Sequence, residues 1–245
     1  LKYAPSERQT VMFSATVPSP IKAIMREYMR SPEYIEIGQE NSTIDEIEQT
    51  YIRISGIEKR YAIVELFRRL IPKRAIIFCN TKRMVDMLLP IMNESGFHTL
   101  ALHGDMAQPE RKRVMGALKN HKAQYLIATD VAARGIDIED VEYIFNFDMP
   151  ADMEYYIHRI GRTGRAGKSG KAISFIGNQD ELILLSDIMT ATRSSITEHE
   201  MAESIEKYAE MMMRERPRGF SSPRDKNRPR NPRPNKSYPP RRKKQ

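Results

Sequence analysis

The sequence predicts an α/β fold in which helices flank a parallel β-sheet. From about Glu46 to Ile188, short β-branched runs alternate with longer amphipathic stretches, as in successive βαβ units. The run Ala75–Cys79 is continuously apolar, which is typical of a strand buried on both faces. The expected strands are residues 51–54, 75–79, 98–102, 125–129, 143–147 and 171–176. The expected helices are residues 57–71, 82–95, 108–120, 152–160 and 178–189.

Two prolines fall in expected helices and have different consequences. Pro90 lies inside the 82–95 stretch, where it removes a backbone donor, so a kink or break is expected there. Pro109 lies in the first turn of the 108–120 helix, where a missing N–H costs nothing. Asp105 or Ala107 would then serve as the cap of that helix.

Composition divides the chain into further segments. Residues 1–37 read as strand, turn and helix and are too few to form a core. Residues 191–216 are expected to be helical, with an apolar stripe that more plausibly packs on the domain than binds a partner or cofactor. Residues 217–245 contain seven prolines among Arg, Lys, Asn and Ser, which predicts disorder. The expected boundaries are therefore 1–37, a linker at 38–45, the main domain at 46–190, a helical extension at 191–216 and a tail at 217–245.

Charge is concentrated in that tail. The whole chain of 245 residues carries a formal charge of +8, but residues 217–245 hold 11 Lys or Arg and one acid, a charge of +10. Residues 1–216 hold 29 basic and 31 acidic groups, a charge of −2. A basic, proline-rich tail favours a polyanionic partner such as RNA, although it could also serve only as a solubilising appendage.

Composition also excludes several classes of protein. Cys79 is the only cysteine, so the chain can build neither a disulfide framework nor a cysteine-rich zinc site. No apolar run approaches the ~18 residues that a membrane span needs. The first residues also lack the apolar region of a signal peptide, and we therefore expect a cytoplasmic protein.

The stretch 156–167, YIHRIGRTGRAG, carries the strongest chemical signal. His158 and Arg162 are four residues apart and share one helix face. Arg159, Arg162 and Arg165 fall within seven residues without a nearby acid, so an anion between them would relieve their repulsion. Planar guanidinium groups match phosphate oxygens, which favours a polyphosphate ligand. A bare GRxGR pattern would fit a surface loop equally well, but the full string is more specific.

Three further strings follow expected strands, at the edge where open α/β sheets bind ligands. ATDVAARGIDI spans residues 128–138, FCNTK spans 78–82, and HGDMAQPER spans 103–111. Helix N-termini bind anions, so these strings suggest phosphate contacts. Considered singly, each would also suit turn and cap chemistry, as Thr129 or Asp130 would in the first.

A complete phosphate-binding P-loop is absent. Gly167-Lys168-Ser169 would end one, but the pattern G-x-x-x-x-G-K-[ST] requires glycine at position 162, which is arginine. The chain likewise contains no Asp-Glu-Ala-Asp segment whose carboxylates could bind a metal ion, and we expect no metal site in it. We therefore expect this chain alone to hydrolyse almost no ATP.

Taken together, in order and spacing, these strings resemble the C-terminal motifs of DEAD-box ATP-dependent RNA helicases of the bacterial type. The resemblance covers residues 1 to about 190 and implies a RecA-like sheet, with residues 1–37 as the end of an upstream RecA-like domain. Ser14-Ala15-Thr16 matches a motif of that upstream domain. Ala107 departs from the pattern, because the family usually has Ser or Thr there.

The resemblance also implies roles for individual residues. Arg162 and Arg165 would be catalytic arginine fingers that face the γ-phosphate of ATP. The implied ATP-binding residues are Gly135, Asp137, Arg162 and Arg165. The implied RNA-binding residues are Thr81, Gly104, Gln108, Arg111, Thr129 and Gly135. Those implied to couple the two domains are Ser14, Thr16, Arg134, His158 and Arg159.

The implied function is that of the C-terminal half of an RNA helicase. ATP with Mg²⁺ would be bound mainly by the upstream domain, and RNA would be held by sequence-independent backbone contacts that couple hydrolysis to local unwinding. Ribosomal or RNA-decay proteins are possible partners. Two alternatives stay open at this point: a DNA helicase or translocase lobe, and a non-catalytic RNA-binding scaffold.

Overall fold

The computed structural model describes residues 4–5, 7–13, 17, 19–35, 46–133, 138, 140–164 and 169–214. The chain divides into two compact units, Leu1–Thr43 and Ile44–Gln245, and each is described by itself. The second unit contains the sheet and most of the predicted site.

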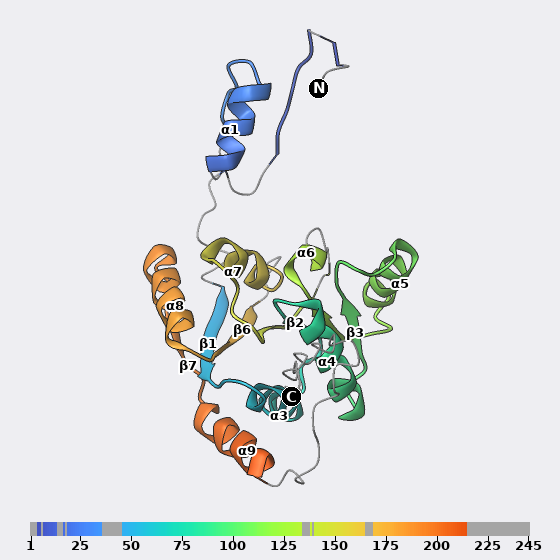
Figure 1. Cartoon of the computed structure of the whole chain (residues 1–245), viewed down its shortest axis with the longest axis vertical. Helices are drawn as coiled ribbons and strands as arrows, with labels where there is room; N and C mark the ends of the chain where they lie inside the picture. The colour runs from blue at the N-terminus through green and yellow to red at the C-terminus, as the bar shows by residue number, and fades with distance from the viewer. Residues whose placement is uncertain are drawn as a thin grey trace, which may run out of the picture. The chain divides into compact units, whose positions relative to one another are not determined.

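A seven-stranded parallel sheet forms the centre of the second unit, which confirms the predicted fold class (Figure 1). The strand order is β3-β4-β2-β5-β6-β1-β7. The strands are β1 (Ile47–Arg53), β2 (Ala75–Phe78), β3 (Thr99–Leu102), β4 (Tyr125–Ala128), β5 (Tyr143–Asn146), β6 (Gly170–Ile176) and β7 (Ile196–Glu198). The partners of β1 are β6 and β7, with Ile47 opposite Gly170 and Gln49 opposite Ile196.

Helices cover both faces of this sheet. The side chains of β2 alternate between two hydrophobic clusters, with Ile76 and Phe78 in one and Ile77 and Cys79 in the other. The helices of the first cluster are α5 (Gln108–Lys119), α6 (Asp130–Ala133), α7 (Met153–Ile160) and α8 (Gln179–Thr192). The helices of the second cluster are α3 (Glu58–Leu70), α4 (Lys82–Glu94) and α9 (Ala202–Arg214). Strands buried on both faces explain the continuous apolar runs in the sequence.

The region after residue 190 belongs to the same unit. It contains strand β7, which the sequence interpretation missed, before helix α9 begins. In α9, Ile205 is 0% and Ala209 is 1% exposed. Arg69 Nη1 of α3 donates to Ser204 Oγ of α9 at 2.8 Å. The apolar stripe therefore packs on the domain, as the simpler of the two interpretations held.

Two other expectations need correction. Of the kink or break expected at Pro90, the break does not occur, because helix α4 continues through Pro90 to Glu94. Pro90 lies on the exposed side of the helix, where water can solvate the carbonyl that it frees. Strand β1 begins at Ile47, four residues earlier than expected. Gln49 and Thr50 are polar, so the sequence did not indicate a buried strand there, but both residues are buried. The expectation for Pro109 agrees with the structure: it lies in the first turn of α5, and Ala107 is the N-cap.

The first unit contains helix α1 (Ser19–Tyr28) and few buried side chains. Tyr34 Oη lies 3.9 Å from Met25 Sδ, whereas Phe13 is 92% and Ile35 is 84% exposed. The linker expected at 38–45 and the tail expected at 217–245 lie outside the described residues. None of the described helices is long and apolar enough to cross a lipid bilayer.

We expect Ile205→Ala to lower the free energy of unfolding by about 3 kcal/mol, because it opens a cavity between α9 and the sheet. Urea denaturation followed by circular dichroism measures this change. Ile183→Ala is the matched control, since Ile183 is 51% exposed and its loss should cost under ~1 kcal/mol. Equal losses in the two variants would contradict the packing of α9 described above.

Candidate site at the strand ends

The end of strand β2 begins the candidate site. Asn80 and Thr81 follow the strand directly, and Thr81 is the N-cap of α4, with its side chain accepting from Met84 N at 3.2 Å. Thr81 is exposed, so its hydroxyl hydrogen can still be donated to a ligand. The first amides of α4 have no partner within the helix and favour an anion.

The segment after β3 lies beside α4. Lys82 Nζ forms an ion pair with Asp105, which raises the pKa of Lys82 and lowers the pKa of Asp105. His103 Nε2 lies 3.3 Å from Asp86 Oδ1. Gly104 is exposed, and a Cβ atom there would meet nothing within 4 Å, so its backbone is open to a ligand. These contacts bring the starts of α4 and α5 together.

The segment after strand β4 lies beside the end of strand β3. Thr129 N donates to Leu102 O at 3.2 Å, and Asp130 begins the short helix α6. Arg111 of α5 donates through Nη2 to Ala132 O at 2.5 Å. Arg111 therefore holds α5 against α6, and this contact occupies part of its guanidinium.

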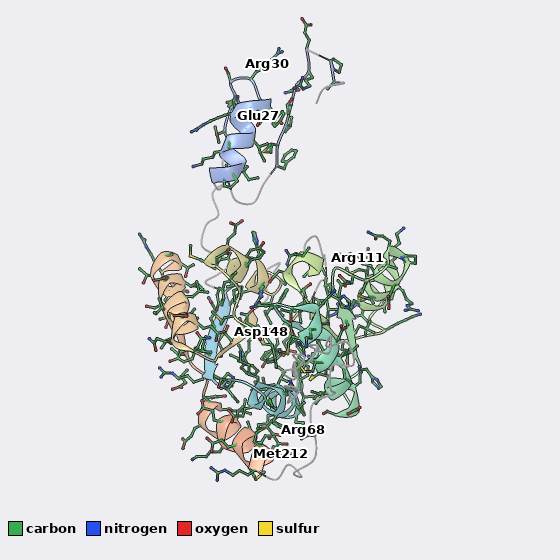
Figure 2. All side chains as sticks on the ribbon, viewed as in Figure 1. Glu27, Arg30, Arg68, Arg111, Asp148 and Met212 are labelled. Atoms are coloured by element: carbon green, nitrogen blue, oxygen red, sulfur yellow. The ribbon has the colours of Figure 1, made fainter. Side chains whose placement is uncertain are left out.

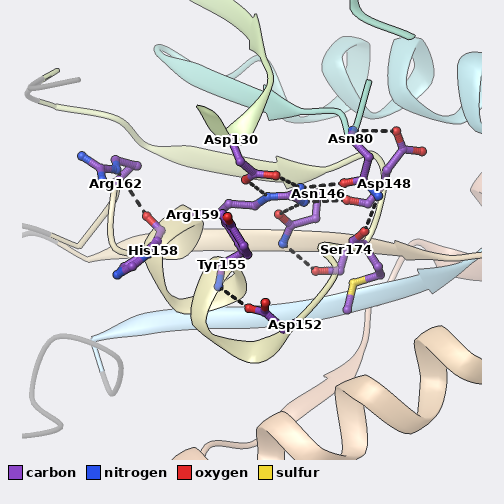
Figure 3. A network of polar contacts seen from close by, with 11 residues as sticks. Asn80, Asp130, Asn146, Asp148, Asp152, Tyr155, His158, Arg159, Arg162 and Ser174 are labelled. Carbon is purple, nitrogen blue, oxygen red and sulfur yellow. Dashed lines mark hydrogen bonds and ion pairs between the residues drawn. The ribbon is translucent and has the colours of Figure 1, made fainter. Parts of the chain in front are cut away.

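A buried guanidinium joins these segments to α7. Arg159 is 1% exposed and forms a two-pronged ion pair with Asp130. Its Nε donates to Asp130 Oδ1 at 2.6 Å, and its Nη2 donates to Asp130 Oδ2 at 2.8 Å. Its Nη2 also donates to Asn80 Oδ1 at 2.8 Å, and its Nη1 donates to Asn146 Oδ1 at 3.2 Å and Asp148 O at 2.6 Å (Figure 3). Its carbon Cζ lies 5.2 Å from the centre of the Phe78 ring. All five N–H bonds of the guanidinium thus have acceptors, which offsets the cost of burying the charge.

A second layer of contacts fixes the partners of Arg159. Asn146 donates through Nδ2 to Ser174 Oγ at 3.0 Å, and Asp148 Oδ2 accepts from Asn80 N at 3.1 Å. Lys59 Nζ donates to Phe147 O at 3.1 Å and lies 3.9 Å from Asp148 Oδ1. The network therefore spans the ends of β2 and β5, the middle of β6, and helices α3, α6 and α7.

Arg162 lies one turn further along, apart from this network in Figure 3. It is half-buried, and its Nε donates to His158 O at 3.2 Å. The next residue, Thr163, is 1% exposed and donates through Oγ1 to Val141 O at 2.5 Å. Gly164 has φ +64°, a conformation that favours glycine. The segment that carries Arg162 is thus held on both sides, by Arg159 and by Thr163.

The hydroxyl and sulfhydryl groups beneath the site are buried and protonated. Burial raises the pKa of the Cys79 thiol well above its ordinary value, and nearby Asp148 raises it further. Burial likewise raises the pKa of Tyr156, whose hydroxyl donates to Gln49 Oε1 at 3.1 Å. Both groups serve packing rather than acid–base chemistry at neutral pH.

The structure brings together many, but not all, of the residues proposed from sequence. Thr81, Gly104, Gln108, Arg111 and Thr129 follow three adjacent strands, and His158, Arg159 and Arg162 lie on or after α7. The remaining candidates, Ser14, Thr16, Arg134, Gly135, Asp137 and Arg165, lie outside the described residues.

For Arg159 the burial changes the interpretation. A side chain whose five donors are used inside its own unit cannot also contact another domain directly, so any coupling role must act through the segments it positions. Asn80, Asp130, Asn146 and Asp148 were not proposed as site residues. The signal that could have identified them is a polar residue at the end of a buried strand, as Asn146 is, or within two residues after it, as the other three are.

No cluster of three His, Cys, Asp or Glu side chains that could hold a metal ion occurs in the described part of the chain. The candidate site is instead rich in cations and amide donors. Such a surface suits phosphate groups.

A parallel sheet with this order of polar segments defines a helicase C-terminal domain, and residues 58–167 match the family model described as "Helicase conserved C-terminal domain". The chain is 38% identical over 193 residues to the DEAD-box ATP-dependent RNA helicase CshA of Bacillus subtilis, which covers 79% of this chain and 39% of CshA. The chain spans about two fifths of the length of the curated relatives it matches.

Solved structures agree. The C-terminal domain of the DEAD-box protein Dbp5 superposes with a TM-score of 0.62 at 33% identity, covering 69% of this chain and 99% of that one. Saccharomyces cerevisiae Dbp5 bound to RNA and ADP BeF3 gives a TM-score of 0.73 at 30% identity, covering 86% of this chain and 57% of that one. The chain belongs to the DEAD-box RNA helicase family and contains its C-terminal RecA-like domain.

We expect Asp130→Asn to lower the free energy of unfolding by about 2–4 kcal/mol, because it leaves the Arg159 charge without its carboxylate in a buried position. Asp86→Asn is the control, since Asp86 is 61% exposed and its pairing with His103 should contribute under ~1 kcal/mol. Urea titrations at neutral pH give both values. A loss at Asp130 no larger than that at Asp86 would show that the network does not depend on the ion pair.

Proposed function

We propose that this chain is the C-terminal half of an ATP-dependent RNA helicase. It binds the RNA backbone and supplies arginine fingers to ATP held by an upstream domain, and hydrolysis drives local unwinding. The observation that carries the proposal is the Arg159 network, which joins Asn80, Asp130 and the end of α7 into one site. A surface loop rich in Arg and Gly would not need such an arrangement.

The RNA side is formed by the segments after β2, β3 and β4. The backbone of Gly104 is open, the hydroxyl of Thr81 is exposed, and Gln108 begins α5 beside them. Amides at helix starts and side chains of this kind contact phosphates and sugars without reading base edges. The binding is therefore expected to be independent of sequence and weakened by salt.

The nucleotide side is formed by the segment after α7. Arg162 and Arg165 face the γ-phosphate, Gly135 and Asp137 contact the nucleotide, and Mg²⁺ is held mainly by the upstream domain. What supports this is that contacts hold the segment of Arg162, since Arg162 Nε donates to His158 O and Thr163 Oγ1 donates to Val141 O. A positioned arginine stabilises the charge that develops in phosphoryl transfer.

The RNA side and the nucleotide side are coupled because contacts within the domain fix the positions of the segments that form them. Asp130 follows Thr129 on the RNA side, and Arg159 precedes Arg162 on the nucleotide side, so their ion pair links the two. His158 and Arg134 face the upstream domain in this proposal, together with Ser14 and Thr16 from that domain.

The terminal segments have separate roles in this proposal. Residues 1–37 belong to the upstream domain, a view supported by the exposure of Phe13 and Ile35, and 38–45 is the linker. The tail at 217–245, with its charge of +10, adds affinity for RNA without selecting a sequence. A DNA helicase lobe would be distinguished by competition between RNA and DNA, and a non-catalytic scaffold by its lack of RNA-stimulated ATPase activity.

Arg162→Ala should lower kcat for RNA-stimulated ATP hydrolysis by roughly 10³-fold or more, while RNA affinity changes little, because a finger acts mainly in the transition state. The measurement is made on the protein that contains this chain together with its upstream ATP-binding domain. Arg214→Ala is the matched control, since Arg214 is an exposed arginine at the end of α9. Wild-type turnover by the Arg162 variant would end the arginine-finger assignment.

Removing the tail should weaken RNA binding at low salt and flatten the dependence of affinity on salt, because fewer counterions are released. Filter binding of the forms 1–245 and 1–216 at two salt concentrations measures both effects. Equal affinities at both concentrations would mean that the tail only confers solubility.

A further inference from the structure

Helix α5 carries a row of basic side chains that extends away from the proposed RNA contacts. Gln108 begins the helix, and Lys112 and Lys119 follow it four and eleven residues later, so all three lie along one strip of the helix surface. Lys122 lies three residues beyond the end of the helix. Both helical lysines and Lys122 are exposed. These three lysines are called the basic α5 face below.

The charge of this segment stands out from the rest of the folded chain. Residues 108–122 contain five basic residues and one acid, a charge of +4, whereas residues 1–216 as a whole carry −2. The remainder of that region is therefore at −6. A concentration of one sign on a single helix creates a local positive potential at the surface.

Packing does not account for these lysines. Helix α5 contacts the sheet through Val114 and Leu118, which are 6% and 1% exposed. Within the described part of the chain, no ion pair or side-chain hydrogen bond involves the basic α5 face. The other two cations of the segment differ, since Arg111 donates to Ala132 O and Arg113 lies 3.6 Å from Glu110. Apart from the favourable position of Lys119 in the last turn of α5, these lysines have no charged partner in the described part of the fold.

The position of the basic α5 face next to the proposed RNA site indicates which kind of anion suits it. Arg111, labelled in Figure 2, donates to Ala132 O and so holds α5 against α6. The strip begins at Gln108, four residues after Gly104 of the proposed RNA site, and runs along α5 to Lys119. The eleven residues from Gln108 to Lys119 span about 16 Å at ~1.5 Å each, or on the order of five nucleotides of a stacked strand at ~3.4 Å each. A chain of phosphates that continues out of the site matches a row of lysine amines better than a single small anion does.

We propose that the basic α5 face is an extension of the RNA site, which binds the phosphates of the RNA flank that leaves the core contacts. The face recognises backbone charge and no particular base. This inference rests on the proposed function, because it takes the core contacts at Thr81, Gly104 and Thr129 as its starting point. Its consequence is that affinity depends on RNA length beyond the stretch that fills the core site.

The test is the binding of two oligouridylates, one of about 6 nucleotides that fills the core and one of about 20 nucleotides that also reaches the flank. The double variant Lys112→Gln with Lys119→Gln is made in the whole chain and removes two positive charges from the basic α5 face. We expect its affinity for the long RNA to fall at least about fivefold. The slope of log affinity against log salt concentration should become less negative by about 1.4, or ~0.7 per lost phosphate contact. Its affinity for the short RNA should stay within about twofold of wild type.

Two controls make the result specific. Lys207→Gln with Arg214→Gln removes the same charge from exposed positions on α9 and should leave both affinities unchanged. Lys112→Arg with Lys119→Arg keeps the charge and should bind as wild type does. Equal losses in the α5 and α9 variants, or equal losses on both RNAs, would overturn the extension. Failure of the wild-type chain to bind even the short RNA would instead remove the proposed function, and the extension with it.

Discussion

The site depends on a single buried charge. The Arg159 guanidinium has almost no contact with water, and burying an ion in a protein is favourable only when every donor finds an acceptor. Its acceptors come from the ends of β2 and β5 and from α6, which are distant in sequence and adjacent in the sheet. Displacement of any one of these segments would leave a buried donor unsatisfied, so the charge holds the segments in one arrangement.

This arrangement explains how rather weak local motifs form a site. Thr81 and Thr129 each belong to a short polar segment that could be an ordinary cap, and Arg162 could belong to an ordinary loop. Because the Arg159 network holds the segments that carry them, these residues form an ordered surface of amide, hydroxyl and cationic donors with no metal-binding cluster in its described part. Such a surface can position phosphate groups.

The sequence predicted the architecture well because burial on both faces leaves a clear pattern. Short, mostly apolar runs between helical stretches identify β2, β4 and β5, and parallel pairing then places the residues that follow them at one edge. The failures occurred where burial and polarity disagree. Gln49 and Thr50 are polar but buried, which hid the start of β1, and the three residues of β7 are too few to form a pattern.

The site was predicted less completely, for a different reason. The spacing of His158, Arg159 and Arg162 shows which residues share a helix face, but it does not reveal which face meets the sheet. Arg159 was therefore expected only to couple the two domains, and its buried network was not predicted, although its partners Asn146 and Asp148 lie only 13 and 11 residues before it. Hydrogen-bond partners depend on tertiary position, which periodicity does not encode.

The pairing of β1 has a consequence for the order in which the chain can fold. Its hydrogen-bonded neighbours are β6 and β7, and β6 begins only at Gly170, more than a hundred residues later. During synthesis, β2 to β5 can associate while β1 still lacks both partners, and closing so long a loop is slow. A ribosome must therefore translate most of the domain before its first strand is protected, and until then that strand is available to chaperones or to wrong partners.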